Sequence, residues 1–427
     1  MAKKERYVVG IDIGSTKTCV LVGEISSEPG ADSAKQAVSS GLLRAAGNGD
    51  AEAQVHFVAA GVAESKGIRK GQIVNLDAAK SAVLRAIEQA EDVAGVPVES
   101  AMVGVAGGQV RGVNSRGGVT LGARPRDVQR EDVQRAVEAA RSVTLPEDRV
   151  VLHVFPQEFF LDGRDSIRQP VGLLGQRLEA NVHIATAAAT AEQNIVSAVN
   201  LAGVKVSGTV LEPYAAAEAC LTADEREMGC CLLDIGGGTT EMIVYTDGVV
   251  RHTAAVAVGG DHFSNDLAVG LRTPVPEAEA IKREHACAFR ELIREDSPIE
   301  ISSVGDRPPR TVFARMLAEI LEPRATELYE LIHDEWKHAG LEGRIPAGVV
   351  ITGGATRLRG LPELAERLFG LPVRLGRPRG IAGLPEEFAQ PDFSVAAGLL
   401  LYGARARRPA GQQGISWGKK IKEMFAG

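Results

Sequence analysis

Two stretches of the chain share one pattern of apolar and polar positions. In each, an apolar run is followed by a turn of small residues and by a second apolar run: VVGIDIGSTKTCVLVGE at 8–24 and CCLLDIGGGTTEMIVYTDG at 230–248. Apolar runs that flank a glycine-containing turn are typical of a β-hairpin. Aligning Asp12 with Asp234 also aligns the two DIG tripeptides and a threonine after each turn. The sequence therefore predicts one hairpin used twice, 222 residues apart.

A repeated hairpin of this composition predicts a polyphosphate site. A turn rich in Gly, Ser and Thr exposes backbone N–H groups and hydroxyls, which can surround phosphate oxygens. Two such turns can hold a nucleotide from opposite sides. Asp12 and Asp234 end their strands at the turns, where a carboxylate can bind Mg²⁺ directly or through its waters. The alternative is two structural hairpins, since glycine in a tight turn also has a purely conformational explanation.

A third glycine turn lies in GVVITGGATRLRGL. A predicted strand over 348–352 is followed by Gly353 and Gly354 and then by a helical pattern. Glycine at this point allows a base or a ribose to approach the backbone closely. Because many strand-to-helix turns need glycine, this motif gains weight only from its place after the two hairpins.

Elsewhere, strand patterns alternate with helical patterns. DAAKSAVLRAIEQAEDVAG and REDVQRAVEAARSV have apolar residues at helical spacing, which predicts helices over 81–94 and 131–143. Between them lie a strand pattern, AMVGVAG, and a glycine-rich stretch, GVNSRGGV, that predicts a hairpin; a further strand, VLHVF, follows. The alternation predicts the α/β class.

Length and composition are those of a globular protein of more than one domain: 427 residues, 44% hydrophobic and 24% charged. The formal net charge of −7 gives no general basic field, so no nucleic acid is expected as a partner. No apolar run approaches the roughly 18–20 residues that span a bilayer, and the start, MAKKERYVVG, is not a signal peptide. The five cysteines form no CxxC pair and are expected to be reduced. A cytoplasmic protein is expected.

These motifs resemble those of the superfamily that includes actin, heat-shock chaperones and sugar kinases, in which two similar halves close over ATP. The first hairpin resembles its phosphate-1 turn, the second its phosphate-2 turn, and ITGGATRL its adenosine motif. The resemblance implies ATP and Mg²⁺ in the cleft between the halves, with Asp12 and Asp234 at the metal. The nucleotide-binding residues expected at the three motifs are Gly14, Ser15, Thr16, Lys17, Gly236, Gly237, Gly238, Thr239, Thr240, Gly353, Gly354 and Ala355.

Within this superfamily the chain resembles the FtsA family of bacterial cell-division proteins. VLHVFPQEFFLDG, PVGLLGQRLEANVHI, VLEPYAAAEACL and AVGGDHFSNDLAVGL carry the resemblance, which runs from about residue 6 to the C-terminus. It implies an actin-like α/β fold: two pseudo-symmetric ribonuclease-H-like halves around a nucleotide cleft, an inserted subdomain and a C-terminal amphipathic helix. The boundaries expected are 1–85 and 166–205 for the core of the first half, 86–165 for the inserted interaction subdomain, 206–245 and 301–402 for the core of the second half, 246–300 for its helical subdomain, 403–414 for a flexible linker and 415–427 for a membrane-targeting helix.

Three charged side chains take expected roles from the resemblance. Glu279 and Lys282, three residues apart on one face of a predicted helix, would lie against the adenosine; an exposed helical ion pair is the alternative. Glu212, in VLEPYAAAEA, occupies the position that orients the attacking water in related filament proteins. The alternative for Glu212 is a structural acid, so a slow ATPase activity is left open.

The chain departs from the family pattern in two places. Residues 26–54 lengthen a connection that is usually short, and their Ala, Ser and Gly content suggests a flexible surface excursion. Ala286 stands where the family commonly has glycine, and its methyl group is expected to crowd the adenine side.

The resemblance also implies partners. The subdomain 246–300 would receive the acidic and apolar C-terminal tail of the tubulin-like division protein FtsZ, with Arg283, Arg290 and Arg294 as candidate contacts; a solvated helix face is the alternative. Self-association into filaments and contacts with other division proteins are implied as well. The expected location is the cytoplasmic face of the cell membrane, at the septum.

The last residues, GISWGKKIKEMFAG, follow a stretch without apolar periodicity, GARARRPAGQQG. On a helix, their apolar side chains fall within one sector about 100° wide, with Ile415 as the exception. The pattern predicts an amphipathic helix in the interface of an anionic membrane; a helix docked on its own domain is the alternative. The residues expected at the membrane are Trp417, Lys419, Lys420, Ile421, Lys422, Met424 and Phe425.

Three functions are compatible with two nucleotide-binding halves. The first is a cytoskeletal adaptor that binds ATP, polymerises and ties FtsZ filaments to the membrane. The second is a small-molecule kinase, which needs a carboxylate base aimed at a substrate hydroxyl, and no substrate motif supplies one. The third is a chaperone or pilus-type ATPase. Only the adaptor uses a basic amphipathic terminus, so the tail favours the adaptor.

Overall fold

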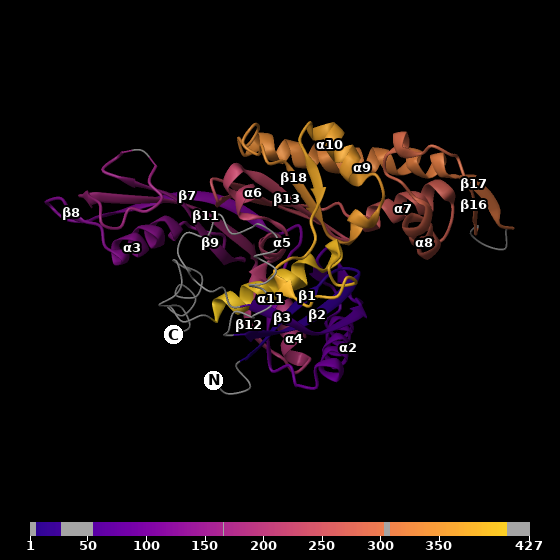
Figure 1. Cartoon of the computed structure of the whole chain (residues 1–427), viewed down its shortest axis with the longest axis horizontal. Helices are drawn as coiled ribbons and strands as arrows, with labels where there is room; N and C mark the ends of the chain where they lie inside the picture. The colour runs from indigo at the N-terminus through magenta and orange to yellow at the C-terminus, as the bar shows by residue number, and fades with distance from the viewer. Residues whose placement is uncertain (1–5, 27–53, 165, 303–307, 408–427) are drawn as a thin grey trace, which may run out of the picture.

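The computed structural model describes residues 6–26, 54–164, 166–302 and 308–407. Two mixed sheets lie at the centre of Figure 1, with a separate three-stranded sheet at one end and a helical region at the other. The predicted helix at 415–427 and nearly all of the connection 26–54 lie outside the described residues. No helix in the described part of the chain is long and apolar enough to cross a membrane.

The sheet of the first half has six strands in the order β12-β6-β1-β2-β3-β20. The apolar runs of its first hairpin are nearly continuous because helices cover both faces of the sheet. Val9 and Ile11 pack in one core with side chains of α2 and α4, whereas Val8 packs in another with side chains of α5 and α11. The bounds are β1 (Tyr7–Ile13), β2 (Lys17–Ser26), β3 (Gln54–Glu64), β6 (Ser100–Val105), β12 (Lys205–Leu211), β20 (Ile381–Ala382), α2 (Leu76–Ala94), α4 (Ala189–Leu201), α5 (Glu212–Cys220) and α11 (Ser394–Ala406).

The sheet of the second half has five strands in the order β15-β14-β13-β18-β19. Leu232 and Ile243 pack with α5 and α11, so these two helices lie between the sheets and share a core with both. Figure 1 shows α11, in yellow, running between the two halves. The bounds are β13 (Cys230–Ile235), β14 (Thr240–Thr246), β15 (Val249–Val256), β18 (Val349–Thr352) and β19 (Val373–Leu375).

The two sheets share strand order and strand direction over five strands. The order β3-β2-β1-β6-β12 corresponds to β15-β14-β13-β18-β19, with antiparallel pairs on one side of the central strand and parallel pairs on the other. The register agrees as well, since Ile11 lies opposite Val103 and Leu233, 222 positions after Ile11, lies opposite Ile351. The two predicted hairpins and the two pseudo-symmetric halves are confirmed.

Three elements assigned by sequence to the second half belong to the first. β12, in the predicted segment 206–245, and β20, in the predicted segment 301–402, are strands of the first sheet. α11, also in the predicted segment 301–402, packs on β1, β2 and β6. The helix also continues through Ala406 into the predicted linker 403–414. At Gly398 a Cβ atom would lie 1.7 Å from the carbonyl oxygen of Ala215 in α5. Glycine therefore allows the backbones of the two central helices to touch, a contact that periodicity alone does not reveal.

The inserted subdomain is shifted relative to its predicted range, 86–165, because its strand β11 lies in the segment 166–205 predicted for the first half. Helix α2 and β6 belong to the first half, and the separate sheet has the order β7-β11-β9, with α3 packed against it. The stretch GVNSRGGV lies within the single strand β7 instead of forming the predicted hairpin. At Gly117 a Cβ atom would lie 2.2 Å from the backbone nitrogen of Ala140, so these glycines let α3 approach the strand. The bounds are β7 (Arg111–Thr120), α3 (Arg130–Arg141), β9 (Arg149–Leu161) and β11 (Arg177–Ala188).

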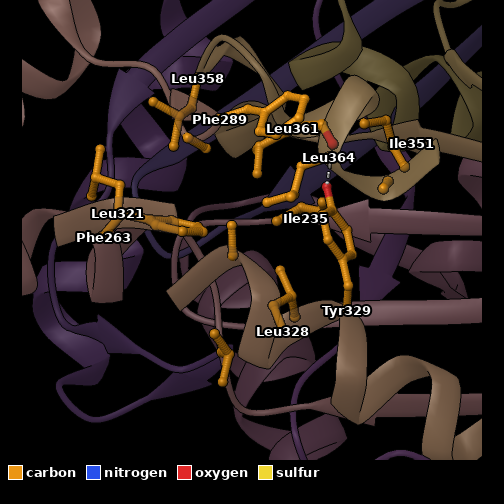
Figure 2. Close-up of a cluster of buried hydrophobic side chains, with 14 of the residues drawn as sticks. Ile235, Phe263, Phe289, Leu321, Leu328, Tyr329, Ile351, Leu358, Leu361 and Leu364 are labelled. Carbon is orange, nitrogen blue, oxygen red and sulfur yellow. Dashed lines mark hydrogen bonds between the residues drawn. The ribbon is translucent and has the colours of Figure 1, made fainter. Parts of the chain in front are cut away.

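The helical part of the second half begins at Gly260, because β15 inside the predicted range 246–300 completes the second sheet. One core joins these helices to the sheet. Figure 2 shows Phe263, Leu328 and Tyr329 packed together, and the Tyr329 hydroxyl donates to the carbonyl oxygen of Leu361 at 2.9 Å. The bounds are α7 (Gly260–Leu271), α8 (Val275–His285), β16 (Pro298–Ile301), β17 (Arg310–Phe313), α9 (Ala314–His338) and α10 (Leu361–Phe369).

Candidate functional site

The two hairpin turns have the same local structure. In the first, the backbone N–H of Gly14 donates to the carbonyl oxygen of Lys17 at 3.0 Å. In the second, Gly236 donates to the carbonyl oxygen of Thr239 at 2.9 Å. The two bonds join equivalent residues, and the strand before each turn ends at an equivalent residue, Ile13 or Ile235, so the similarity of sequence is also a similarity of backbone.

The turns face each other across the two halves. A Cβ atom at Gly237 would lie 2.4 Å from the hydroxyl oxygen of Thr16, and one at Gly238 would lie 3.0 Å from that of Ser15. Glycine at both positions therefore lets the second turn approach the first. The residues that the sequence assigned to two phosphate turns are brought together at one place.

The third glycine turn joins the second. Gly353 has a φ of +90°, and a Cβ atom there would lie 2.3 Å from Oδ1 of Asp234. Glycine is required both by this backbone conformation and by the close approach. The short 3₁₀ helix η3 (Gly354–Arg357) follows, and Ala355 lies near Gly260 at the start of α7. The predicted adenosine motif thus lies directly beside the predicted phosphate-2 turn.

The start of α7 rests on the same turn. The backbone N–H groups of Gly260 and Asp261 donate to the carbonyl oxygens of Gly236 and Gly237, at 2.9 Å and 2.7 Å. Lys282, from α8, donates to the carbonyl oxygen of Gly260 at 3.0 Å. The predicted phosphate-2 turn is therefore hydrogen-bonded to the start of α7, and α7 is hydrogen-bonded to Lys282 of α8.

Glu279 and Lys282 form an ion pair, with 2.6 Å between Oε2 and Nζ. Lys282 also donates to the hydroxyl of Ser264 at 2.8 Å, and Arg283 donates to Glu279 at 2.7 Å. The ion pair agrees with the alternative interpretation, but Lys282 is only 9% exposed and is not on a solvated helix face. Contact with adenosine stays a prediction for both residues.

Ala286 is buried in the core of the second half, at the end of α8. A methyl group inside this core stabilises the packing of the helix. Its expected effect on the adenine side stays a prediction.

Four buried carboxyl groups surround the place where the turns meet: those of Asp12, Glu212, Asp234 and Glu241. Burial raises the pKa of Asp12 to about 6, although Lys17 opposes the shift. Burial and the neighbouring carboxylates raise the pKa of Asp234 and of Glu212 well above the usual range. Burial also raises the pKa of Glu241 to about 7. Ionisation of each group is unfavourable, because it places negative charge in a buried position. A cation among these groups would therefore be bound favourably.

The chemistry of these donors fits Mg²⁺, which prefers carboxylate oxygens and usually keeps several waters. Within the described residues, no three Asp, Glu, His or Cys side chains come close enough together to hold one ion directly. Asp12 and Asp234 would therefore bind the ion mainly through its waters, as the sequence analysis allowed.

Glu212 is the first residue of α5 and is 8% exposed. A Cβ atom at Gly104 would lie 2.8 Å from Oε1 of Glu212, so glycine makes room for this carboxyl group in β6. The preceding residue, Leu211, donates its backbone N–H to Nε2 of His153 in the inserted subdomain at 3.0 Å. The position of Glu212 among the buried carboxyl groups is compatible with orienting a water and with a structural role, and both stay open.

Sequence reasoning missed two residues of the site. Glu241 lies opposite Asp234 in the hairpin register and accepts from the backbone N–H of Gly107 at 3.1 Å. The register of a hairpin could have identified it. Asp392 accepts from Lys17 at 2.6 Å and from Arg357 at 2.8 Å, and although burial opposes the shift, these two cations lower its pKa. No local pattern marks Asp392, because it lies 375 positions from Lys17.

The raised pKa values predict a pH dependence. A cation that binds to ionised carboxylates competes with protons. Because their pKa values are raised to about 7 and about 6, Glu241 and Asp12 take up protons as the pH falls through these values. Affinity for Mg-ATP is therefore expected to fall at least about tenfold between pH 8 and pH 5.5. Isothermal titration calorimetry at constant ionic strength measures it. A constant affinity over this range would show that these carboxyls do not contribute.

Comparisons with known proteins give a consistent result. A family model described as "Cell division protein FtsA" matches residues 231–398, and a model described as "SHS2 domain inserted in FTSA" matches residues 107–186. The curated protein "Cell division protein FtsA" of Pseudomonas aeruginosa is 40% identical over 411 residues, which is 96% of this chain and 92% of that protein. The protein of the same description from Escherichia coli K12 is 36% identical over 409 residues, 94% of this chain and 91% of that protein.

Solved structures share the fold at low sequence identity. The "PilM-PilN type IV pilus biogenesis complex" matches with a TM-score of 0.62 and 18% identity, over 94% of this chain and 99% of that chain. "MreB5 of Spiroplasma citri bound to ADP" matches with a TM-score of 0.51 and 14% identity, over 93% of this chain and 96% of that chain. The two sheets and their connections are thus an actin-like arrangement.

Proposed function

The chain belongs to the FtsA family of cell-division proteins, and we propose that it binds ATP, polymerises and anchors FtsZ filaments to the cytoplasmic membrane. The observation that carries the nucleotide part is the approach of two equivalent glycine turns, Gly237 to Thr16, beside four buried carboxyl groups. The relatives cover nearly the whole chain, which supports the assignment of one function to the whole protein.

Nucleotide binding is supported by the order in which the three glycine turns lie next to one another. The adenosine motif at Gly353 lies next to Asp234, and the two phosphate turns follow, so one elongated ligand can contact all three. The solved structures of MreB5 of Spiroplasma citri, which share the fold, are bound to ADP and to AMPPNP. Lys282 would line the adenosine side, a proposal supported by its hydrogen bond to the carbonyl oxygen of Gly260.

Mg²⁺ would be held by Asp12 and Asp234 through its waters, and would neutralise phosphate charge. Glu212 is the candidate for orienting a hydrolytic water. Its raised pKa means that it acts as a base only when a nearby cation restores its ionised form. We therefore propose hydrolysis that is slow and dependent on the metal.

The membrane contact would be made by residues 415–427, whose lysines would flank the apolar face of the helix predicted from sequence. One short amphipathic helix binds an anionic surface weakly. Many copies along a polymer bind together through effective concentration. Attachment would therefore follow assembly, which explains why a filament-forming protein needs only a short anchor.

The FtsZ tail would bind at the helical part of the second half, on the three exposed arginines predicted from sequence. Arg283 is already paired with Glu279. Arg290 lies in a surface hollow with acidic side chains of α9, including Glu319 and Glu322, which would repel an acidic tail. Arg294 is therefore the strongest candidate of the three.

The decisive experiment images labelled FtsZ on a supported anionic bilayer with Mg-ATP and the purified full chain. FtsZ filaments are expected to be recruited by the intact protein and not by a variant that ends at residue 414. Recruitment by the truncated variant would contradict the proposal that residues 415–427 are the membrane anchor. A lack of recruitment by the intact protein would contradict the adaptor function.

A further inference from the structure

A two-residue hairpin turn touches both phosphate turns. The short strands β4 (Ile68–Arg69) and β5 (Gln72–Ile73) pair antiparallel, and Lys70 and Gly71 form the turn between them. Lys70 has a φ of +51° and Gly71 a φ of +71°. Positive φ at both central residues defines a type I′ turn, which suits the twist of a hairpin.

Lysine is an unusual residue at this place. The first central position of a type I′ turn strongly favours Asn, Asp or Gly. In the left-handed region a Cβ atom lies too close to the following carbonyl oxygen; glycine has no Cβ, and the short polar side chains of Asn and Asp can hydrogen-bond locally. Lys70 is one of only four residues other than glycine with positive φ in the described part of the chain. A turn selected for its conformation alone would carry Asn-Gly, so the lysine side chain itself needs an explanation.

The backbone of this turn lies against the site. A Cβ atom at Gly238 would lie 2.7 Å from Cα of Lys70, so the phosphate-2 turn and the hairpin are in direct contact. The backbone N–H of Gly71 donates to the hydroxyl of Ser15 in the phosphate-1 turn at 3.1 Å. The hairpin is thus fixed at the point where the two phosphate turns meet.

The charges around the cleft leave a role for one more cation. Lys17 is paired with Asp392, and Lys282 is paired with Glu279. Lys70 is exposed, and among the described residues no carboxylate is paired with it. A polyphosphate in a site with four buried carboxyls needs positive charge, and an exposed lysine on a fixed backbone can supply it.

The order of the motifs indicates which phosphate Lys70 meets. Gly236, at the start of the phosphate-2 turn, lies beside Gly260 and the adenosine motif, whereas Gly238, at its end, touches Lys70. A nucleotide that runs along the turn from the adenosine side brings its last phosphate closest to the hairpin. We propose that Lys70 binds the terminal phosphate of a nucleoside triphosphate held between the two turns, which makes it a further binding residue that distinguishes ATP from ADP. This inference rests on the proposed nucleotide binding.

The test measures ATP and ADP dissociation constants, with Mg²⁺, for the full chain and for Lys70→Asn, Lys70→Arg and Lys66→Asn. Lys70→Asn suits the turn and is expected to weaken ATP binding about tenfold while changing ADP binding less than about twofold. Lys70→Arg keeps the charge and should restore most of the affinity for ATP. Lys66, whose partner at 3.7 Å is Glu64, is the matched control and should leave both constants unchanged.

Thermal unfolding separates binding from folding, because Asn at this turn position should leave the melting temperature equal or higher. The inference is overturned if Lys70→Asn keeps the wild-type affinities, if it weakens ATP and ADP equally, or if Lys70→Arg fails to restore ATP binding. If the unaltered protein binds neither nucleotide, the proposed function itself fails, which is a separate result.

Discussion

Asparagine in place of Asp234 is expected to stabilise the nucleotide-free protein while weakening Mg-ATP binding on the order of 100-fold. Asp234 is buried, and burial together with Glu241 and Asp12 raises its pKa well above the usual range. Asparagine has nearly the same shape and no charge, so it removes a repulsion that costs on the order of 1 kcal/mol or more. It also removes a carboxylate expected to hold the waters of Mg²⁺.

The sign of the stability change depends on pH. A carboxyl whose folded-state pKa is raised lowers stability once the pH exceeds its unfolded value of about 3.9, so the advantage of Asp234→Asn grows as the pH rises. Chemical denaturation at pH 5 and pH 8 measures the difference in unfolding free energy between the variant and the wild type, and calorimetry measures Mg-ATP binding. Asp12→Asn is the matched control at the equivalent position: its pKa reaches only about 6 because Lys17 opposes the shift, so a smaller gain in stability is expected. Lower stability of Asp234→Asn at pH 8 would contradict the penalty for the buried charge, and unchanged affinity for Mg-ATP would contradict the metal assignment.

Glutamate at both Trp417 and Phe425 is expected to abolish binding of the protein to anionic liposomes. Both residues lie on the predicted apolar face of the tail, and charge there removes the apolar area that enters the interface. Co-sedimentation with vesicles that contain phosphatidylglycerol measures the bound fraction. ATP affinity should be unchanged, because neither residue belongs to the three glycine motifs expected to bind the nucleotide.

The chain offers a matched control for this change at Ile415, which falls outside the apolar sector. Ile415→Glu should leave most of the binding intact, because the helix start contributes little to the buried face. If the double variant still binds liposomes, or if Ile415→Glu abolishes binding as completely, an oriented amphipathic helix is not the anchor.

The sequence by itself determined the repeated hairpins, their turns and the α/β class. These features depend on residues that are close in sequence. A short apolar run next to Gly236 predicts a buried strand, and a glycine between two such runs predicts a turn. The motif at Gly353 was readable for the same reason, since a φ of +90° requires glycine. The resemblance to a known family followed from the same residues and was confirmed over nearly the whole chain.

Tertiary structure alone decided which segments share a sheet and which charges meet. β12 pairs parallel with β6 in the first sheet, and parallel partners distant in sequence leave no local signal of their pairing. Asp392 pairs with Lys17 from the far end of the chain. The hairpin of Lys70 and Gly71 touches both turns only because it folds against Gly238 and Ser15. The physical reason is the same in each case: periodicity encodes which face of an element is buried, whereas the packing of distant elements sets what that face meets.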